Sequence, residues 1–146
     1  MSLQEQINTD LIAATKSGDS GKVGVLRLLK NAFTNEQIKL RHELSEEELL
    51  KVLAREAKQR RDSIQAYRDG GREDLATEEE AELKIIETYL PLQISDEELE
   101  GIIASVIEEL GSDVQLGRVI GGVMKRVASR ADGGRVSDMV RKRIQP

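Results

Sequence analysis

The sequence has no cysteine and no tryptophan, and it has few other aromatic residues. Without cysteine, disulfide bonds, thiolate nucleophiles and Cys-ligated zinc are excluded, and a reducing compartment is the simplest expectation. The aromatic residues are Phe33, Tyr67 and Tyr89, so the core must consist of Leu, Ile, Val and Ala. Single-strand RNA-binding modules stack bases on aromatic side chains. The composition disfavours such modules and leaves the backbone of a folded RNA open as a ligand.

Long hydrophobic runs are also missing. No segment approaches the roughly 18 apolar residues of a membrane span. The first residues, MSLQEQINTD, lack the basic-then-apolar order of a secretory signal peptide. We therefore expect a cytoplasmic protein that does not enter the membrane.

The formal net charge of −5 is unevenly distributed along the chain. Residues 1–110 hold 14 Lys/Arg against 24 Asp/Glu, whereas residues 111–146 hold 8 against 3. An acidic body with a basic end suggests that this end binds an anionic partner. The alternative is that these cations only complement the C-terminal dipole of the last helix.

Helical periodicity covers nearly the whole chain, and strand signals are absent, which predicts an all-α fold. Capping-box patterns begin three helices, at Ser2, Ser45 and Ser95. We expect helices over residues 3–18, 20–40, 46–70, 77–90, 96–110, 115–128 and from 133 onward. Because Pro91 disfavours helix continuation, we predict an N-terminal helical bundle over residues 1–92 and a three-helix domain over residues 93–146.

The long third helix has two distinct faces. Its predicted buried stripe consists of Leu49, Leu53, Ala57, Ile64 and Tyr67. The opposite ridge consists of Lys51, Arg55 and Lys58, and it is either a solvated face or a surface for phosphates or an acidic partner. Arg60 projects into the apolar stripe one turn after Glu56, which predicts a partly buried ion pair that fixes packing.

Three glycines lie inside the predicted helix 115–128, where each costs about 1 kcal/mol relative to Ala. On a helical wheel, the predicted inward face consists of Val119, Ile120, Val123 and Val127. Gly117 and Gly121 flank this apolar face, which suits close helix packing. Gly122 lies between two cations, Arg118 and Lys125, where a missing side chain lets an RNA backbone approach. The competing interpretation is that Gly122 is merely tolerated.

The candidate RNA-binding surface joins the last two helices and the turn between them. Free N–H groups after Asp132 can bind phosphate, unless Asp132 itself caps them. The candidate residues are Arg118, Gly122, Lys125, Arg126, Arg130, Arg135, Arg141 and Lys142.

Signals for an enzyme are weak. His42 is the only histidine and has no marked partner for a metal site or catalytic triad. Residues 18–22 (GDSGK) differ from a phosphate-binding loop, because they follow a helix and have the wrong glycine spacing. The acidic clusters 46–48, 78–80 and 96–98 fall at the first helical turns, where carboxylates complement the helix dipole. We expect no catalytic residues, no metal and no cofactor.

Four segments, in order, resemble the YqeY family: RLLKNAFTNEQI, REAKQRRDSIQAYRDGGREDL, ETYLPLQISDEEL and GRVIGGVMKRVASRADGGRV. They span residues 27–136, and the resemblance covers essentially the whole chain. The family's C-terminal module is similar to the tail of the aspartyl/glutamyl-tRNA amidotransferase B subunit, which helps to hold the tRNA while other parts of that enzyme perform the chemistry.

The resemblance implies a non-catalytic accessory module that binds tRNA and is associated with amidotransferase or aminoacyl-tRNA machinery. Kinship alone would link it to carbon–nitrogen ligase activity with glutamine as amido donor. The family's tail motif falls at Gly117, Gly121, Met124, Ala131, Asp132 and Gly133. Ser129 departs from the family pattern, which has glycine there, and Leu92 replaces a polar residue. The alternative function is a protein interaction adaptor that uses the acidic N-terminal bundle.

Overall fold

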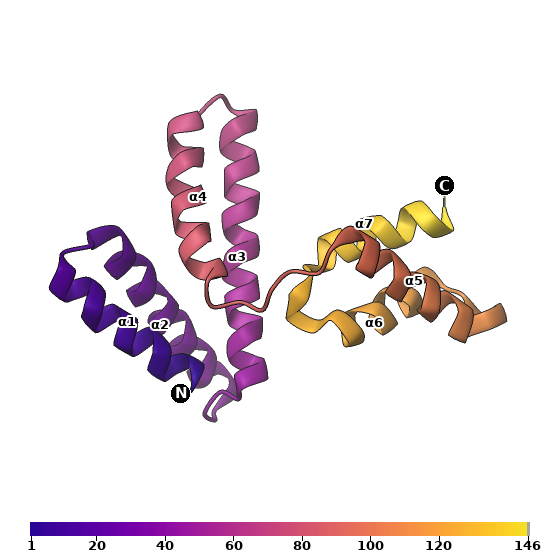
Figure 1. The fold of residues 1–146 in the computed structure, drawn as a ribbon, viewed down its shortest axis with the longest axis horizontal. Coiled ribbons are helices and arrows are strands. Elements are labelled where there is room, and N and C mark those ends of the chain that lie inside the picture. The colour runs from indigo at the N-terminus through magenta and orange to yellow at the C-terminus, as the bar shows by residue number, and fades with distance from the viewer. Residues whose placement is uncertain (146) are drawn as a thin grey trace. The chain divides into compact units, whose positions relative to one another are not determined.

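A computed structural model describes residues 1–145, and Pro146 lies outside the described residues (Figure 1). Residues 1–145 form seven α-helices and two short 3₁₀ turns, with no strand among them. The all-α fold predicted from the sequence is therefore confirmed. The chain divides into two compact units, Met1–Leu90 and Pro91–Pro146, which are described separately.

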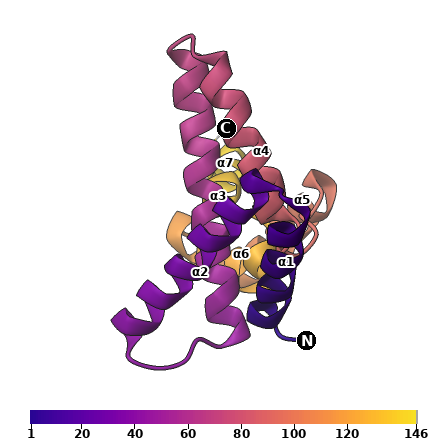
Figure 2. The ribbon, with the colours of Figure 1, turned by 90° about the vertical axis from the view of Figure 1, so that its left-hand side faces the viewer.

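The N-terminal unit consists of two helical hairpins. Helices α1 (Leu3–Ser17) and α2 (Ser20–Leu40) form the first, and α3 (Glu46–Asp69) and α4 (Glu73–Glu87) form the second (Figures 1 and 2). The predicted capping boxes at Ser2 and Ser45 are both present. Gly18 ends α1 at φ 75°, a left-handed conformation that favours glycine.

Both hairpins contribute to the core of this unit. Ile7, Leu26, Leu29, Leu53 and Ile86 are fully buried in one cluster. The predicted stripe of α3 is confirmed for Leu49, Leu53, Ala57 and Ile64, which are buried, whereas Tyr67 is half-buried. After α4, the Tyr89 hydroxyl donates a 2.5 Å hydrogen bond to Asp10 of α1, and burial with this bond raises the pKa of the phenol. The contact joins the two hairpins.

The predicted start of the fourth helix at Thr77 was wrong, because α4 begins at Glu73. Gly71 adopts φ 74°, and the Arg72 N–H bonds the Tyr67 carbonyl at 2.7 Å. This compact turn reverses the chain within a few residues, so helix α4 starts directly after Arg72. Glu73 and Asp74 lie in its first turn, where carboxylates complement the dipole, so the assignment of residues 78–80 to a first turn was also wrong.

Arg60 lies in a cluster of carboxylates between α3 and α4. The predicted contact with Glu56 is confirmed at 3.8 Å, and both side chains are 12% exposed. Arg60 Nε also lies 3.0 Å from Glu82 and 3.4 Å from Glu79. Three carboxylates therefore surround one guanidinium, and the group fastens α4 to α3.

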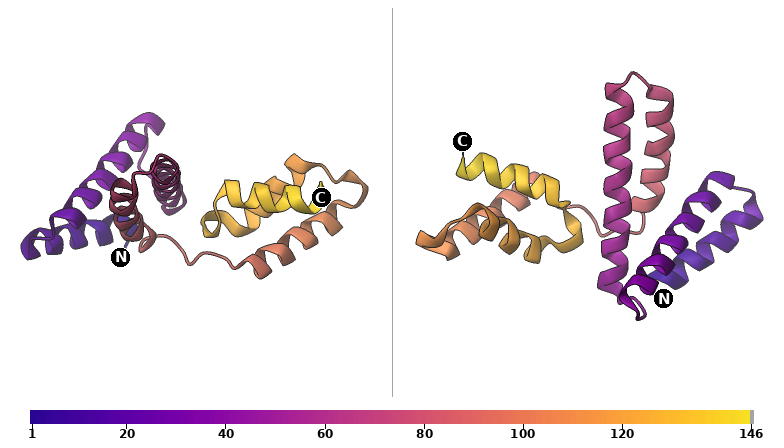
Figure 3. Two further views of the ribbon diagram at one scale, coloured as in Figure 1. Left: turned by 90° about the horizontal axis from the view of Figure 1, so that it is seen from above. Right: turned by 180° about the vertical axis from the view of Figure 1, so that it is seen from behind.

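The C-terminal unit contains helices α5 (Asp96–Leu110), α6 (Leu116–Val127) and α7 (Gly133–Ile144), with 3₁₀ turns at Gly111–Asp113 and Ala128–Arg130 (Figure 3). Leu99, Ile103, Val119, Val123 and Val136 are among its fully buried core residues. At the start of α5, the Ser95 hydroxyl accepts a hydrogen bond from the Glu98 N–H at 3.1 Å.

The segment before α5 lies against the α6–α7 turn. The Ile94 N–H donates to the Arg130 carbonyl at 2.8 Å, and Arg130 Nε donates to the Leu92 carbonyl at 3.3 Å. Gln93 Nε2 also donates to the Ser129 carbonyl at 3.2 Å. These hydrogen bonds fix residues 92–94 to the turn between α6 and α7. That the two units fold independently, as the predicted domains 1–92 and 93–146 imply, stays a prediction.

Within the described residues, no helix combines the length and the apolar character needed to cross a membrane.

Candidate nucleic-acid interface

Helix α6 presents one apolar and one open face. Val119, Val123 and Val127 are buried at the spacing of an amphipathic helix. The exposed residues on the other side include Gly117, Arg118, Gly121 and Lys125. Two cations therefore flank two positions where the helix has no side chain.

The predicted role of Gly122 was wrong. A Cβ atom at this position would lie 2.9 Å from Cγ1 of Val106, a buried residue of α5. Gly122 thus permits close packing of α6 on α5, and it does not leave the backbone open to a ligand. The prediction placed Gly122 from the helix wheel of α6 alone, which does not show where α5 crosses it.

Gly117 and Gly121 were predicted to allow close helix packing, and this was also wrong. A Cβ atom at either position would meet nothing within 4 Å. Both residues are exposed, so the accessible backbone of α6 lies at Gly117 and Gly121.

The turn before α7 is capped by its own side chain. Asp132 Oδ1 accepts hydrogen bonds from the Gly134 N–H at 2.7 Å and the Arg135 N–H at 3.2 Å. The capping interpretation is therefore confirmed, and these N–H groups are occupied. Two other motif residues, Ala131 and Met124, pack in the core of the unit, while Gly133 is exposed.

Ala128 ends α6 in a strained conformation. Its φ of 49° and ψ of −123° belong to a region that residues with a Cβ rarely adopt. This change of direction positions Ser129 and Arg130, whose carbonyls accept the hydrogen bonds of residues 93 and 94.

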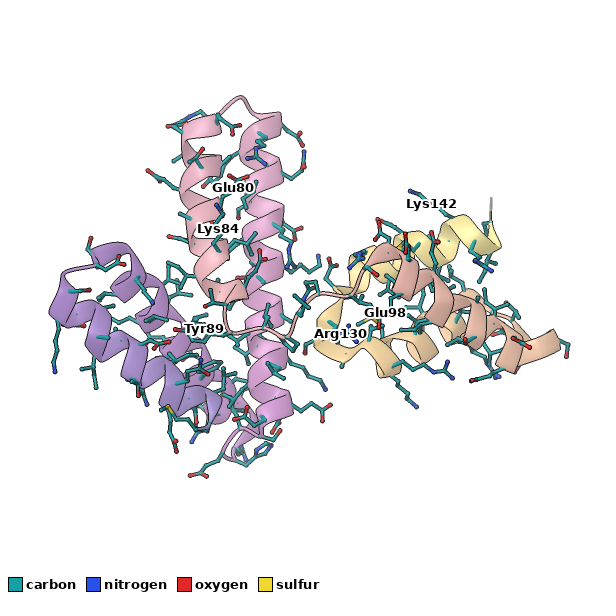
Figure 4. The ribbon with its side chains drawn as sticks, in the orientation of Figure 1. Glu80, Lys84, Tyr89, Glu98, Arg130 and Lys142 are labelled. Atoms are coloured by element: carbon teal, nitrogen blue, oxygen red, sulfur yellow. The ribbon has the colours of Figure 1, made fainter. Side chains whose placement is uncertain are left out.

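Four candidate arginines have carboxylate partners within the unit. Arg135 lies 2.6 Å from Asp96, and Arg130 lies 3.3 Å from Glu98. Arg126 pairs with Glu109, and Arg118 pairs with Asp113. Figure 4 labels Glu98 and Arg130 in this unit. Each partner comes from α5 or the 3₁₀ turn that follows it.

The Arg126–Glu109 pair perturbs both groups. The guanidinium hydrogen bond holds the pKa of the Glu109 carboxyl below its ordinary value. The same bond raises the pKa of Arg126. Both groups therefore remain charged at neutral pH, so the positive charge of Arg126 is balanced locally.

The other candidate cations differ from these arginines in having no carboxylate partner among residues 1–145. They are Lys125, Arg141 and Lys142, and all three side chains are exposed. Arg143 belongs to the same set, although it was absent from the predicted site. Figure 4 shows Lys142 extending away from α7. We call Lys125, Arg141, Lys142 and Arg143 the free cations.

The unit is less basic than the sequence suggested. Residues 91–146 hold 8 Lys/Arg and 9 Asp/Glu, which leaves a formal charge of −1. The division at residue 110 separated the acidic helix α5 from the two basic helices that it packs against. Positive charge is therefore local to parts of α6 and α7.

Other sequence candidates lie in the N-terminal unit. The ridge residues Lys51, Arg55 and Lys58 pair with Glu47, Glu36 and Asp62. His42 is exposed, with Nε2 3.5 Å from Glu48. Across the described residues, no group of three or more His, Cys, Asp or Glu side chains is arranged to hold a metal ion.

Comparison with known proteins identifies a family and a curated relative. The model of the family described as "Yqey-like protein" matches residues 4–144. A curated protein of Vanderwaltozyma polyspora, "Altered inheritance of mitochondria protein 41, mitochondrial", is 35% identical over 85 residues. That match spans 58% of this chain and 46% of the relative, so it covers less than half of that protein.

Proposed function

This chain belongs to the family of Yqey-like proteins, and from that premise we propose that it is a tRNA-binding accessory module without catalytic activity of its own. One observation carries the proposal. The free cations of α6 and α7 have no carboxylate partners in the described part of the chain, and Lys125 lies on the helix whose backbone is accessible at Gly117 and Gly121.

Exposed cations without partners suit a phosphate backbone. Each Lys or Arg that neutralises a phosphate releases condensed counterions, which makes the binding strong at low salt and weak at high salt. Glycines at 117 and 121 remove the steric barrier between a phosphate and the helix surface. The proposed interface therefore consists of the free cations and these two glycines, and it no longer includes Gly122.

Folded RNA fits better than single-stranded RNA. The aromatic residues Phe33 and Tyr89 are buried, Tyr67 is half-buried, and all three lie in the N-terminal unit. The C-terminal unit thus has no aromatic side chain on which a base can stack. Resemblance of this unit to the amidotransferase tail favours tRNA, and amidotransferase or aminoacyl-tRNA machinery as the associated enzymes. A cytoplasmic location is part of the proposal.

Titration of unfractionated tRNA against increasing salt tests the proposal. The variant Lys125→Ala/Arg141→Ala/Lys142→Ala should bind roughly 10-fold more weakly than wild type at low salt. Its plot of log affinity against log salt should be less steep by roughly 0.7 to 0.9 for each phosphate that the variant no longer neutralises.

The matched control is Lys16→Ala/Arg27→Ala/Lys84→Ala, which removes the same charge from exposed residues of the N-terminal unit (Figure 4 labels Lys84). These three residues also have no ion-pair partner among residues 1–145. Equal binding by the two triple variants, or no binding of tRNA by wild type at low salt, would contradict the proposed interface.

The alternative, a protein interaction adaptor, has one observation in its favour. Ile38 of α2 is 69% exposed and lines an open cavity of about 580 Å³ with Thr34, Gln37, Arg41 and His42. Recovery of a protein partner after nuclease treatment, abolished by Ile38→Asp, would support the adaptor. Loss of all bound partners after nuclease would support RNA binding.

A further inference from the structure

The arginines and lysines of the C-terminal unit form two sets of four. Arg118, Arg126, Arg130 and Arg135 each face a carboxylate of α5 or its following turn. The free cations face no carboxylate within the described residues. Only the free cations, half of the Lys and Arg residues of this unit, are therefore directly available to an anionic ligand.

The pairs are accessible to solvent. The paired arginine side chains are 28% to 56% exposed, and the carboxylate side chains are 50% to 75% exposed. Exposed pairs of this kind contribute little to stability. A phosphate that docks at the right place can thus exchange with a carboxylate at small cost to the fold.

At longer range, the pairs act differently from free charges. A positive and a negative group within 4 Å largely cancel for an ion that is several ångströms away, whereas an unpaired cation still attracts that ion out to the Debye length of about 8 Å. A flexible polyanion that is attracted without fixed contacts therefore experiences mainly the free cations. An RNA of matching shape reaches the paired arginines as well.

Resting on the proposed function, we propose that Asp96, Glu98, Glu109 and Asp113 are specificity-determining residues of the RNA interface. These carboxylates neutralise four arginines, so an unstructured polyanion is not attracted to them. When a structured RNA docks, its phosphates replace the carboxylates as partners of the arginines. Unfavourable contacts with the wrong ligand are a general route to specificity.

Two quadruple variants of the full chain test this inference. The first, Asp96→Asn/Glu98→Gln/Glu109→Gln/Asp113→Asn, releases the paired arginines. The second, Glu97→Gln/Glu100→Gln/Glu108→Gln/Asp138→Asn, changes exposed carboxylates of the same unit that have no ion-pair partner in residues 1–145. Both raise the net charge by four, so a general electrostatic effect is the same in each.

Binding is measured with poly(U) as the unstructured probe and unfractionated tRNA as the folded one, over a series of salt concentrations. We expect the first variant to bind poly(U) at least about 10-fold more tightly than the second, with a salt slope steeper by roughly 3. The ratio of tRNA affinity to poly(U) affinity should fall in the first variant and stay near the wild-type value in the second.

Because Asp96 and Glu98 lie in the first turn of α5, far-UV circular dichroism checks that each variant is folded. If the first variant does not fold, the pair Glu109→Gln/Asp113→Asn against Glu100→Gln/Glu108→Gln replaces it, with about half the expected slope difference. Equal poly(U) affinity and slope in the matched variants would overturn the inference. The proposed function fails separately, if wild type does not bind tRNA or the free-cation variant binds it unchanged.

Discussion

At the residue scale, Glu79 is the least satisfied group of the Arg60 cluster. Its Oε2 atom is buried and accepts no hydrogen bond in the described structure, although Arg60 Nε lies 3.4 Å away. Burial, and then the neighbouring charge of Glu82, raises the pKa of the Glu79 carboxyl above its ordinary value of 4.5. Arg60 opposes this shift without cancelling it.

The raised pKa sets the sign of a pH effect. The folded protein holds the Glu79 proton more tightly than the unfolded chain, so folding is favoured at low pH and this advantage is lost as pH rises above 4.5. Glu79→Gln should therefore raise the free energy of unfolding at pH 7. Below pH 4 it should have little effect. Urea denaturation at both pH values measures this.

Glu78→Gln is the control for that measurement, because Glu78 is the exposed neighbour of Glu79. A Glu79→Gln protein that is less stable than wild type at pH 7 would show that the contact with Arg60 outweighs the cost of burial.

The sequence predicted part of this cluster. Arg60 and Glu56 are one helical turn apart, so their contact follows from helix geometry. Glu82 is 22 residues from Arg60, and its contact depends on the register in which α4 packs against α3. That register is set by the turn at Gly70–Arg72, whose tightness was not recognised from the sequence.

At the scale of the helix, α6 provides a matched pair of glycine substitutions. Gly121→Ala places a methyl group in open space on the exposed side of the helix, so it should stabilise the unit by about 0.4–1 kcal/mol. Gly122→Ala places the same group 2.9 Å from Val106, where overpacking costs about 1–3 kcal/mol. Denaturant midpoints of the two variants should therefore move in opposite directions.

A second mutation should relieve the overpacking caused by Gly122→Ala. Val106→Ala removes the methyl groups that the new Cβ would meet. Destabilisation by Gly122→Ala should be smaller in the Val106→Ala background than in wild type. Additive effects of the two changes would exclude close packing at this point.

The roles of the glycines in α6 could not be predicted from the sequence of that helix alone. The valines of α6 identify the buried face, and the structure confirms it. The direction from which α5 approaches that face depends on side chains of α5, and it decides which glycine is required. The helical wheel of α6 therefore predicted the buried face correctly, but the roles it suggested for the glycines were wrong.

At the scale of the whole molecule, each compact unit has its own hydrophobic cluster. We expect residues 1–90 and 91–146 to fold when produced separately, and the far-UV circular dichroism of the two pieces to sum to that of the intact chain. The shorter piece should be the less stable, because small domains bury a smaller fraction of their surface. A piece without helical signal would contradict this expectation.

Charge was the property least predictable from the sequence at this scale. A boundary at residue 110 gave a basic end, whereas the compact unit includes α5 and is close to neutral. The acidic residues 96–98 of α5 were interpreted as complements to its dipole. That Asp96 and Glu98 also reach Arg135 and Arg130 depends on tertiary packing between helices.

The hydrogen bonds of residues 92–94 determine how the C-terminal unit responds to tension. A pull applied through Pro91 acts on the hydrogen bonds that Leu92, Gln93 and Ile94 make with Ser129 and Arg130, before it reaches α5. Mechanical strain from a tethered neighbour is thus delivered to the turn between α6 and α7. When these three bonds break, the turn loses its hydrogen bonds to the segment that precedes α5.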